Sequence, residues 1–266
     1  MAEKLLKKPR TDSHLDTVRE SFEKQAEDFS RSPVMTDAEA LDRLAAWTGL
    51  SGTELVLDVA CGPGLVAVAL AAGARHVVGI DVTPAMIARA CEVVAERGAA
   101  NVTFALGDGT QLPVSDGAFD RVVCRRSFHH FPDPGAVLAE MSRVCVPGGM
   151  VVIEDQAALP DHQAAETMRT IDLLRDPSHA RAVDPGAWEP LFERCGLVRD
   201  RIALHPRDLD FDEWMNRAHP DPADASRARE LLEAAARGEI PGPRAWQSGG
   251  ALLFRIEFQI VRAVKA

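Results

Sequence analysis

The sequence predicts an α/β fold, in which a doubly wound, mostly parallel sheet of seven strands lies between layers of helices, with helical caps near both termini. Strand-like and helix-like segments alternate from residue 54 to residue 155, and a Gly-Pro-Gly turn follows the first apolar run. The 266 residues are 46% hydrophobic, which suffices for one large domain with a cap.

The expected strands are short apolar runs without internal glycine-proline turns. Continuous apolar runs are typical of strands that are buried on both faces of a parallel sheet. The last two expected strands follow a mostly helical stretch that begins after residue 156. The seven strands are expected over residues 55–59, 76–81, 102–105, 121–124, 150–154, 197–204 and 252–264.

Helices are expected between these strands, and two of them carry clear terminal signals. Pro84 suits the first position of a helix, and Gly196 suits the position just after one. The expected helices span residues 65–72, 84–97, 134–144 and 188–195.

The alternating part divides the chain into regions. Residues 54–157 form the expected ligand-binding core of a main domain that spans 47–266, and residues 1–46 are interpreted as a tail and lid helices. Two polar, mostly helical stretches interrupt the rest of the main domain. We expect these stretches, at about 158–185 and 211–245, to form a cap and a substrate pocket.

Charge and cysteine content exclude several classes of protein. Thirty Lys and Arg residues stand against forty Asp and Glu residues, a formal net charge of −10, which argues against nucleic acid as a partner and favours a cationic or neutral ligand. No apolar stretch is long enough to span a membrane, and the N-terminus lacks the apolar region of a signal peptide. Five widely spaced cysteines without a C-x-x-C pair indicate neither a disulfide framework nor a metal site, so we expect a cytoplasmic protein. Oligomeric state is not predicted.

The turn after the first expected strand favours a nucleotide-like ligand, and two ligands compete for it. Gly62-x-Gly64-x-x-Ala67, with Asp81 nineteen residues after Gly62, fits the fingerprint of a dinucleotide site. Asp58, at the tip of the strand, would repel a pyrophosphate but attract an ammonium and a sulfonium group. The charge therefore favours S-adenosylmethionine.

A second acid follows the third expected strand, in Gly107-Asp108-Gly109. Its carboxylate could accept a hydrogen bond from the adenine amino group, or it could simply close an Asx turn.

Four linked motifs resemble the class I S-adenosylmethionine-dependent methyltransferases, of the ubiquinone/menaquinone-methyltransferase-like (methyltransferase type 11) group, and an uncharacterised bacterial subgroup among them. They are L-V-L-D-V-A-C-G-P-G (55–64), G-I-D-V-T-P-A-M-I (79–87), the run from G-D-G-T-Q to S-F-H-H-F (107–131) and M-S-R-V-C-V-P-G-G-M (141–150). The resemblance implies a Rossmann-like fold. It also implies cofactor contacts from Asp58, Ala60, Gly62, Pro63, Gly64, Asp81, Val82, Met86, Gly107, Asp108, Gly109 and Arg125.

The N-terminal segment Phe22-x-x-x-Ala26-x-x-Phe29 resembles the helix that covers the cofactor in this family, where tyrosine often stands at the position of Phe29. The same spacing equally fits a stripe that faces the core. Phe29 is therefore a candidate cofactor contact that cannot offer a phenolic hydrogen bond.

Three histidines are candidate catalytic residues, and they are ranked His130, His129, His179. His129 and His130 follow the fourth expected strand, at the edge of the sheet where open α/β folds bind ligands. His179 lies in the first polar stretch of the cap. A histidine near its ordinary pKa of about 6.5 suits proton transfer from an acceptor.

The predicted function is transfer of a methyl group from S-adenosylmethionine to a small-molecule acceptor, through O, N, S or C. One alternative is a cofactor-binding protein that no longer methylates or that catalyses another reaction. The other is an NAD-dependent oxidoreductase, which Asp58 disfavours, and the chain has no tyrosine for a Tyr-x-x-x-Lys catalytic pair.

Overall fold

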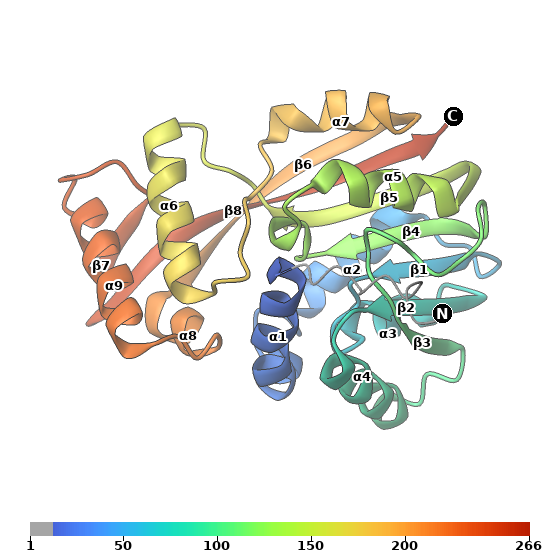
Figure 1. The fold of residues 1–266 in the computed structure, drawn as a ribbon, viewed down its shortest axis with the longest axis horizontal. Helices are drawn as coiled ribbons and strands as arrows, with labels where there is room; N and C mark the ends of the chain where they lie inside the picture. The colour runs from blue at the N-terminus through green and yellow to red at the C-terminus, as the bar shows by residue number, and fades with distance from the viewer. Residues whose placement is uncertain (1–12) are drawn as a thin grey trace, which may run out of the picture.

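A computed structural model describes residues 13–266, and the predicted tail over residues 1–12 lies outside the described part. An eight-stranded sheet crosses the molecule in the order β3-β2-β1-β4-β5-β8-β6, with β7 paired to β8 (Figure 1). The strands are β1 (Leu55–Val59), β2 (His76–Asp81), β3 (Val102–Leu106), β4 (Phe119–Arg125), β5 (Cys145–Gln156), β6 (Leu197–Asp210), β7 (Ala245–Ser248) and β8 (Ala251–Lys265).

The first five strands are parallel, so their carboxyl ends meet at the same edge of the sheet. Leu57 of β1 lies beside Val78 of β2 on one side and Val122 of β4 on the other. The strand order reverses between β1 and β4, which is where open α/β sheets form a ligand crevice. The loops after β1, β2 and β4 therefore converge on this crevice.

Helices cover both faces of the parallel part and bury its apolar runs. α5 and α7 pack on one face around Met141 and Trp188, and α2 and α3 pack on the other around Trp47 and Leu70. The predicted α/β fold is confirmed. These layers and their neighbours are α1 (Ser13–Arg31), α2 (Ala38–Thr48), α3 (Leu65–Ala71), α4 (Pro84–Arg97), the short 3-10 helix η1 (Phe128–His130), α5 (Pro134–Val144), η2 (Pro185–Ala187) and α7 (Trp188–Arg194).

The cap is built on a long antiparallel ribbon of β6 and β8 that extends beyond the parallel strands (Figure 1). β6 continues to Asp210, past the expected end at Leu204, because it pairs with β8 along its whole length. β7 is an eighth strand that the sequence analysis did not expect. Helices α6 (His162–Arg175), α8 (Phe211–Asn216) and α9 (Pro222–Ala236) pack against this ribbon around Phe254.

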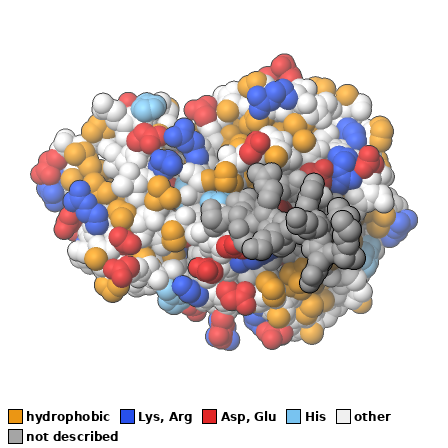
Figure 2. Space-filling model, in the orientation of Figure 1, with side chains coloured by type: hydrophobic (Ala, Val, Ile, Leu, Met, Phe, Trp, Pro, Cys, Tyr) orange, Lys and Arg blue, Asp and Glu red, His pale blue; other side chains and the backbone are white. Residues whose placement is uncertain are grey.

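The surface carries mixed charge. On the face drawn in Figure 2, Lys and Arg side chains are interspersed with Asp and Glu side chains. Among residues 13–266, none of the helices combines the length and the apolar character that a membrane crossing needs.

Candidate active site

The loop after β1 makes a tight turn, and backbone hydrogen bonds tie it to β2. Ala60, Gly62 and Gly64 all have left-handed backbone angles, with φ of 54°, 51° and 76°. Such a conformation costs a residue with a Cβ atom about 1 kcal/mol or more, so Ala60 is held in place by its surroundings. The Gly62 N–H donates to Oδ2 of Asp81 at 2.8 Å, which links the turn to the end of β2.

A pocket opens over the carboxyl ends of β1, β2 and β4, and we call it the strand-edge pocket. The structure brings to it nearly all of the residues that the sequence analysis assigned to the cofactor. They are Phe29, Asp58, Ala60, Gly62, Pro63, Asp81, Val82, Met86, Gly107, Asp108, Gly109 and Arg125.

Gly64 is the exception, because it does not line the strand-edge pocket. A Cβ atom at Gly64 would lie 2.8 Å from the ring of Phe104 on β3. Glycine is therefore required here by packing beneath the loop as well as by the positive φ, and direct contact with a cofactor is not what the geometry favours.

Asp58 faces the strand-edge pocket as a buried and poorly satisfied carboxylate. Asp58 is 1% exposed, and neither carboxylate oxygen has a hydrogen-bond partner of normal geometry among residues 13–266. Burial, together with the nearby carboxylate of Asp81, raises the pKa of Asp58 to about 8, and Arg125 offsets this only in part. The site thus offers an acceptor for a cationic group, which fits the ammonium of S-adenosylmethionine.

The two other predicted acids are anchored by backbone N–H groups. Asp81 accepts hydrogen bonds from Gly62 and from Thr83, the latter at 2.9 Å, so its position is fixed while its remaining lone pairs can meet ribose hydroxyls. Asp108 accepts from the N–H of Thr110 at 2.8 Å. It therefore forms the Asx turn considered above and also lines the pocket.

Helix α1 closes one side of the strand-edge pocket. Phe22 and Phe29 both line it, with ring centroids 5.8 Å apart in an edge-to-face arrangement, whereas Ala26 is buried and does not line it. The two aromatic residues of the predicted motif thus face the pocket and the alanine packs inward.

A second pocket, which we call the cap pocket, lies between α1, η1 and the cap. It shares Phe22, Phe29, Met35, Arg126 and His130 with the strand-edge pocket, so the two adjoin. Its other lining residues include His129, Gln156, Asp172, Arg175, Asp176, His179, Leu209, Trp214, Arg217, Ile256 and Phe258.

His130 stands at the junction of the two pockets and presents an unprotonated nitrogen. Its Nδ1 lies 3.1 Å from the carbonyl oxygen of Ser178, which can only accept, so Nδ1 carries the proton. Burial, followed by the charge of His129, lowers the pKa of His130, and the ring is neutral at pH 7. With the proton on Nδ1, the lone pair is on Nε2, and this side chain lines both pockets, where a ligand can meet it.

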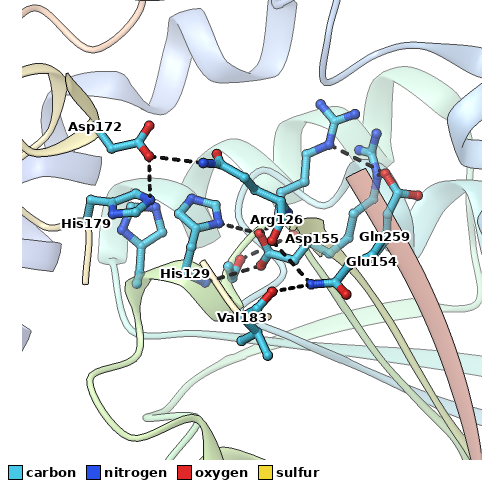
Figure 3. A network of polar contacts seen from close by, with 12 residues as sticks. Arg126, His129, Glu154, Asp155, Asp172, His179, Val183 and Gln259 are labelled. Carbon is cyan, nitrogen blue, oxygen red and sulfur yellow. Dashed lines mark hydrogen bonds and ion pairs between the residues drawn. The ribbon is translucent and has the colours of Figure 1, made fainter. Parts of the chain in front are cut away.

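His129 turns the other way and pairs with Asp155 at the end of β5 (Figure 3). Its Nδ1 lies 2.5 Å from Oδ1 of Asp155. Burial alone disfavours a charged ring, but the Asp155 carboxylate outweighs this effect and raises the pKa of His129. His129 therefore lines the cap pocket as one half of an ion pair and does not line the strand-edge pocket.

His179 lies farther into the cap, stacked on His129 with ring centroids 5.0 Å apart. Burial and the charge of His129 lower its pKa to about 3. Nε2 lies 3.4 Å from Oδ2 of Asp172 (Figure 3), and neither ring nitrogen makes a hydrogen bond of normal geometry among residues 13–266. Burial raises the pKa of the neighbouring Asp172 to about 6. Within the described residues, no group of three or more His, Cys, Asp or Glu side chains is arranged to hold a metal ion.

The sequence analysis missed the acid and base residues that hold this region together. Glu154 is buried between two guanidinium groups, 3.3 Å from Nε of Arg125 and 3.5 Å from Nε of Arg126. Asp155 follows it directly, at the carboxyl end of β5. The signal was present, because paired charges lie near the ends of two neighbouring strands, Arg125-Arg126 at the end of β4 and Glu154-Asp155 in β5.

Loss of the Asp155 charge should destabilise the protein most at mildly acidic pH. We expect Asp155→Asn to lower the free energy of unfolding by about 2 kcal/mol at pH 6, since His129 loses a charge-assisted hydrogen bond. The folded-state pKa of His129 is raised, so the stabilisation is complete below the ordinary histidine pKa and is lost as pH rises through the folded value. Urea unfolding at pH 6 and pH 9 measures this, and an equal loss at both would contradict the ion pair.

The fold and the two adjoining pockets define a nucleotide-type ligand site on a doubly wound α/β sheet, and comparisons with known proteins specify the family. Residues 56–149 match the model of a methyltransferase domain. An uncharacterised methyltransferase from Bacillus subtilis, YcgJ, is 30% identical over 77% of this chain and 81% of its own length. The crystal structure of YcgJ superposes with a TM-score of 0.78 at 24% identity, over 85% of this chain and 98% of that chain.

A further relative is the 27-O-demethylrifamycin SV methyltransferase of Amycolatopsis mediterranei, 32% identical over 73% of this chain and 81% of that protein. The chain belongs to the class I S-adenosylmethionine-dependent methyltransferases.

Proposed function

We propose that this protein transfers the methyl group of S-adenosylmethionine to a small-molecule acceptor that binds in the cap pocket. The observation that carries the proposal is the junction of the two pockets, where His130 lines both the site with the unpartnered Asp58 and the pocket beside it. The name of the Amycolatopsis relative, which acts on a rifamycin, supports a small-molecule acceptor.

Three acids of the strand-edge pocket suit three polar parts of S-adenosylmethionine. Asp58 would hold the ammonium group, Asp81 the ribose hydroxyls and Asp108 the adenine amino group. When bound, S-adenosylmethionine supplies an electrophilic methyl group next to the acceptor. The chain itself excludes water beneath Phe22 and Phe29 and fixes the orientation of the acceptor, which can contribute several kcal/mol to the rate.

His130 would act on the acceptor through Nε2. A hydroxyl or protonated amine of the acceptor can donate to this lone pair and deliver its proton there as the new bond to carbon forms. His129 and His179 stay candidates, but His129 is engaged with Asp155, and His179 lies beyond it. All five cysteines are free, which supports our proposal that the protein works in the cytoplasm.

Calorimetric titration with S-adenosylhomocysteine tests the proposal. The wild-type protein should bind it, Asp81→Ala should bind it at least tenfold more weakly, and NADH fluorescence should not change on addition of protein. Release of S-adenosylhomocysteine from S-adenosylmethionine in the presence of an acceptor panel then separates a methyltransferase from a protein that only binds the cofactor. Absence of binding, or unchanged binding by Asp81→Ala, would refute the cofactor assignment.

A further inference from the structure

Three arginines from three separate elements line the cap pocket. Arg126 follows β4, Arg175 ends α6 and Arg217 follows α8, and all three belong to the lining of the same pocket. The overall charge of −10 favours cationic or neutral ligands, so this local concentration of guanidinium groups runs against the composition of the chain. Such a cluster needs a specific explanation.

Each guanidinium is oriented by a hydrogen bond to the protein, which leaves other N–H groups of the same fork unused. A guanidinium has five N–H donors in a rigid plane, so one anchor fixes the direction of the rest. The anchors are Arg126 Nη1 to the Val34 carbonyl (2.9 Å), Arg175 Nε to the Trp214 carbonyl (2.9 Å) and Arg217 Nη1 to Ser32 Oγ (2.7 Å).

Two of the unused donors are buried. Nε of Arg126 and Nε of Arg217 are both inaccessible to solvent and have no hydrogen-bond partner in the part of the chain that the structure describes. A buried donor without a full hydrogen bond costs about 1–3 kcal/mol. These two Nε atoms face Glu154 and Glu213, at 3.5 and 3.9 Å, so neither guanidinium is fully neutralised by a close carboxylate contact at Nε. Burial and Arg125 also lower the pKa of Arg126 to about 9, while burial and Arg175 lower that of Arg217 to about 10.

The carboxylates of the protein do not use up these donors. Glu154 is shared between Arg125 and Arg126, and Glu213 reaches no closer than 3.9 Å to Nε of Arg217. Asp172 and Asp176 also line the pocket, but both already accept hydrogen bonds, Asp172 from Gln156 Nε2 at 3.0 Å. The donors to Asp176 are Ser21 Oγ (2.8 Å), Gln25 Nε2 (3.3 Å), Ser178 N (2.9 Å) and Ser178 Oγ (2.6 Å).

Aromatic side chains form part of the remaining wall of the cap pocket, beside its histidine, glutamine and aspartate residues. Phe22 and Phe29 face it from α1, and Trp214 and Phe258 face it from the cap. Two of these rings also stack with the cationic groups, since Arg175 lies 4.6 Å from the Trp214 centroid and Arg126 lies 4.5 Å from that of Phe258. The pocket thus combines four aromatic side chains with guanidinium groups that the protein holds in place.

We propose that the methyl acceptor is a small carboxylic acid with a flat apolar body, and that its carboxylate binds the guanidinium groups of Arg126, Arg175 and Arg217. This inference rests on the proposed function, because it names the substrate class for the pocket next to the cofactor. The carboxylate is the group expected at these donors because a planar guanidinium engages its two oxygens in parallel.

The test uses aryl and arylalkyl carboxylates of graded length, from benzoate and 4-hydroxybenzoate to cinnamate and 3-phenylpropionate, each paired with its primary amide. Binding to wild-type protein saturated with S-adenosylhomocysteine is measured by calorimetry. The best carboxylate should bind about 10–100-fold more tightly than its amide, because charged hydrogen bonds replace neutral ones. If no carboxylate in the series binds better than its amide, or if phenyl phosphate binds better than all of them, the inference is overturned.

Substitutions of single arginines test whether the preference for a carboxylate arises in the cap pocket. Arg217→Gln should weaken binding of the best carboxylate at least tenfold and leave its amide unchanged, whereas Arg217→Lys should recover part of the affinity. Arg199→Gln is the matched control, because Arg199 lies on β6, is paired with Glu189 and does not line the cap pocket. Equal carboxylate affinity in Arg217→Gln and wild type would also overturn the inference. Binding of S-adenosylhomocysteine with no carboxylate preference leaves the proposed function intact, whereas its absence refutes both.

Discussion

Asp58→Asn should bind S-adenosylhomocysteine about 100-fold more weakly than the wild type, although the ligand-free variant should be the more stable protein above pH 8. The first effect arises because the asparagine cannot balance the charge of a buried ammonium group, a loss of about 2–5 kcal/mol for pairs of this kind. The second arises because the carboxylate is buried without normal hydrogen bonds when no ligand is present.

The raised pKa of Asp58 fixes the pH dependence of both effects. Below its folded-state pKa of about 8 the carboxyl group is mostly protonated, so a cationic ligand must displace a proton to bind. Wild-type affinity should therefore rise by up to tenfold per pH unit from pH 6 to 8 and then level off, whereas Asp58→Asn should show no such rise. Titration at pH 7 in buffers of different ionisation enthalpy should detect release of nearly one proton.

Rising pH should strengthen ligand binding but should lower the stability of the ligand-free wild type. The unfolded chain loses the Asp58 proton near its ordinary pKa of about 3.9, whereas the folded chain retains it to about pH 8, so rising pH destabilises the wild type across this window. In thermal unfolding of the ligand-free protein, the melting temperature of Asp58→Asn should therefore exceed that of the wild type by an amount that grows from pH 5 to pH 8.5. Asp116→Asn is the control, since Asp116 is exposed and paired with Arg143. If Asp58→Asn bound S-adenosylhomocysteine with the same affinity and the same pH dependence as the wild type, the assigned role of Asp58 would be contradicted.

The parallel half of the fold could be predicted because its signals are local. Each strand of this half contains a short apolar run, although β5 begins five residues before the expected strand, at Cys145. Pro84 and Asp133 sit at the start of helices that have the bounds the sequence predicts. The glycine loop could also be predicted, because Gly62 and Gly64 take the positive φ angles that glycine adopts at least cost. The structure adds that a side chain at Gly64 would collide with the ring of Phe104. Phe104 lies on another strand, and nothing in the sequence indicates this contact.

The cap pocket could not be predicted because its contacts join distant parts of the chain. Asp176 receives hydrogen bonds from Ser21 and Gln25 on α1, more than 150 residues earlier, and it also accepts from Ser178, which contacts His130. The side chains of residues that are adjacent in the sequence can also point to different sites. His129 and His130 adjoin in the chain, but a turn of η1 sends one ring to Asp155 and the other to the junction of the pockets.

His130→Gln should lower the rate of methyl transfer by about 100-fold or more while it changes the affinity for S-adenosylhomocysteine less than threefold. Glutamine can occupy the junction, but it offers no basic nitrogen to receive the proton of the acceptor, and removal of a general base typically costs this much. The rate is measured as S-adenosylhomocysteine release with the best acceptor of the panel. His76→Gln, on the exposed side of β2 where His76 contacts Thr103, should leave both quantities unchanged.

A measurement without any acceptor separates this role from a structural one. Because the Nδ1 proton of His130 faces the Ser178 carbonyl and burial lowers its pKa, the ring should remain neutral from pH 8 down to pH 5, with Nε2 unprotonated. Nitrogen-15 spectra of labelled histidine report this tautomer directly, and His129, whose pKa is raised by Asp155, should be the ring that titrates above 6.5. A charged His130 at pH 7, or a proton on its Nε2, would leave no lone pair for the acceptor and would exclude His130 as the base.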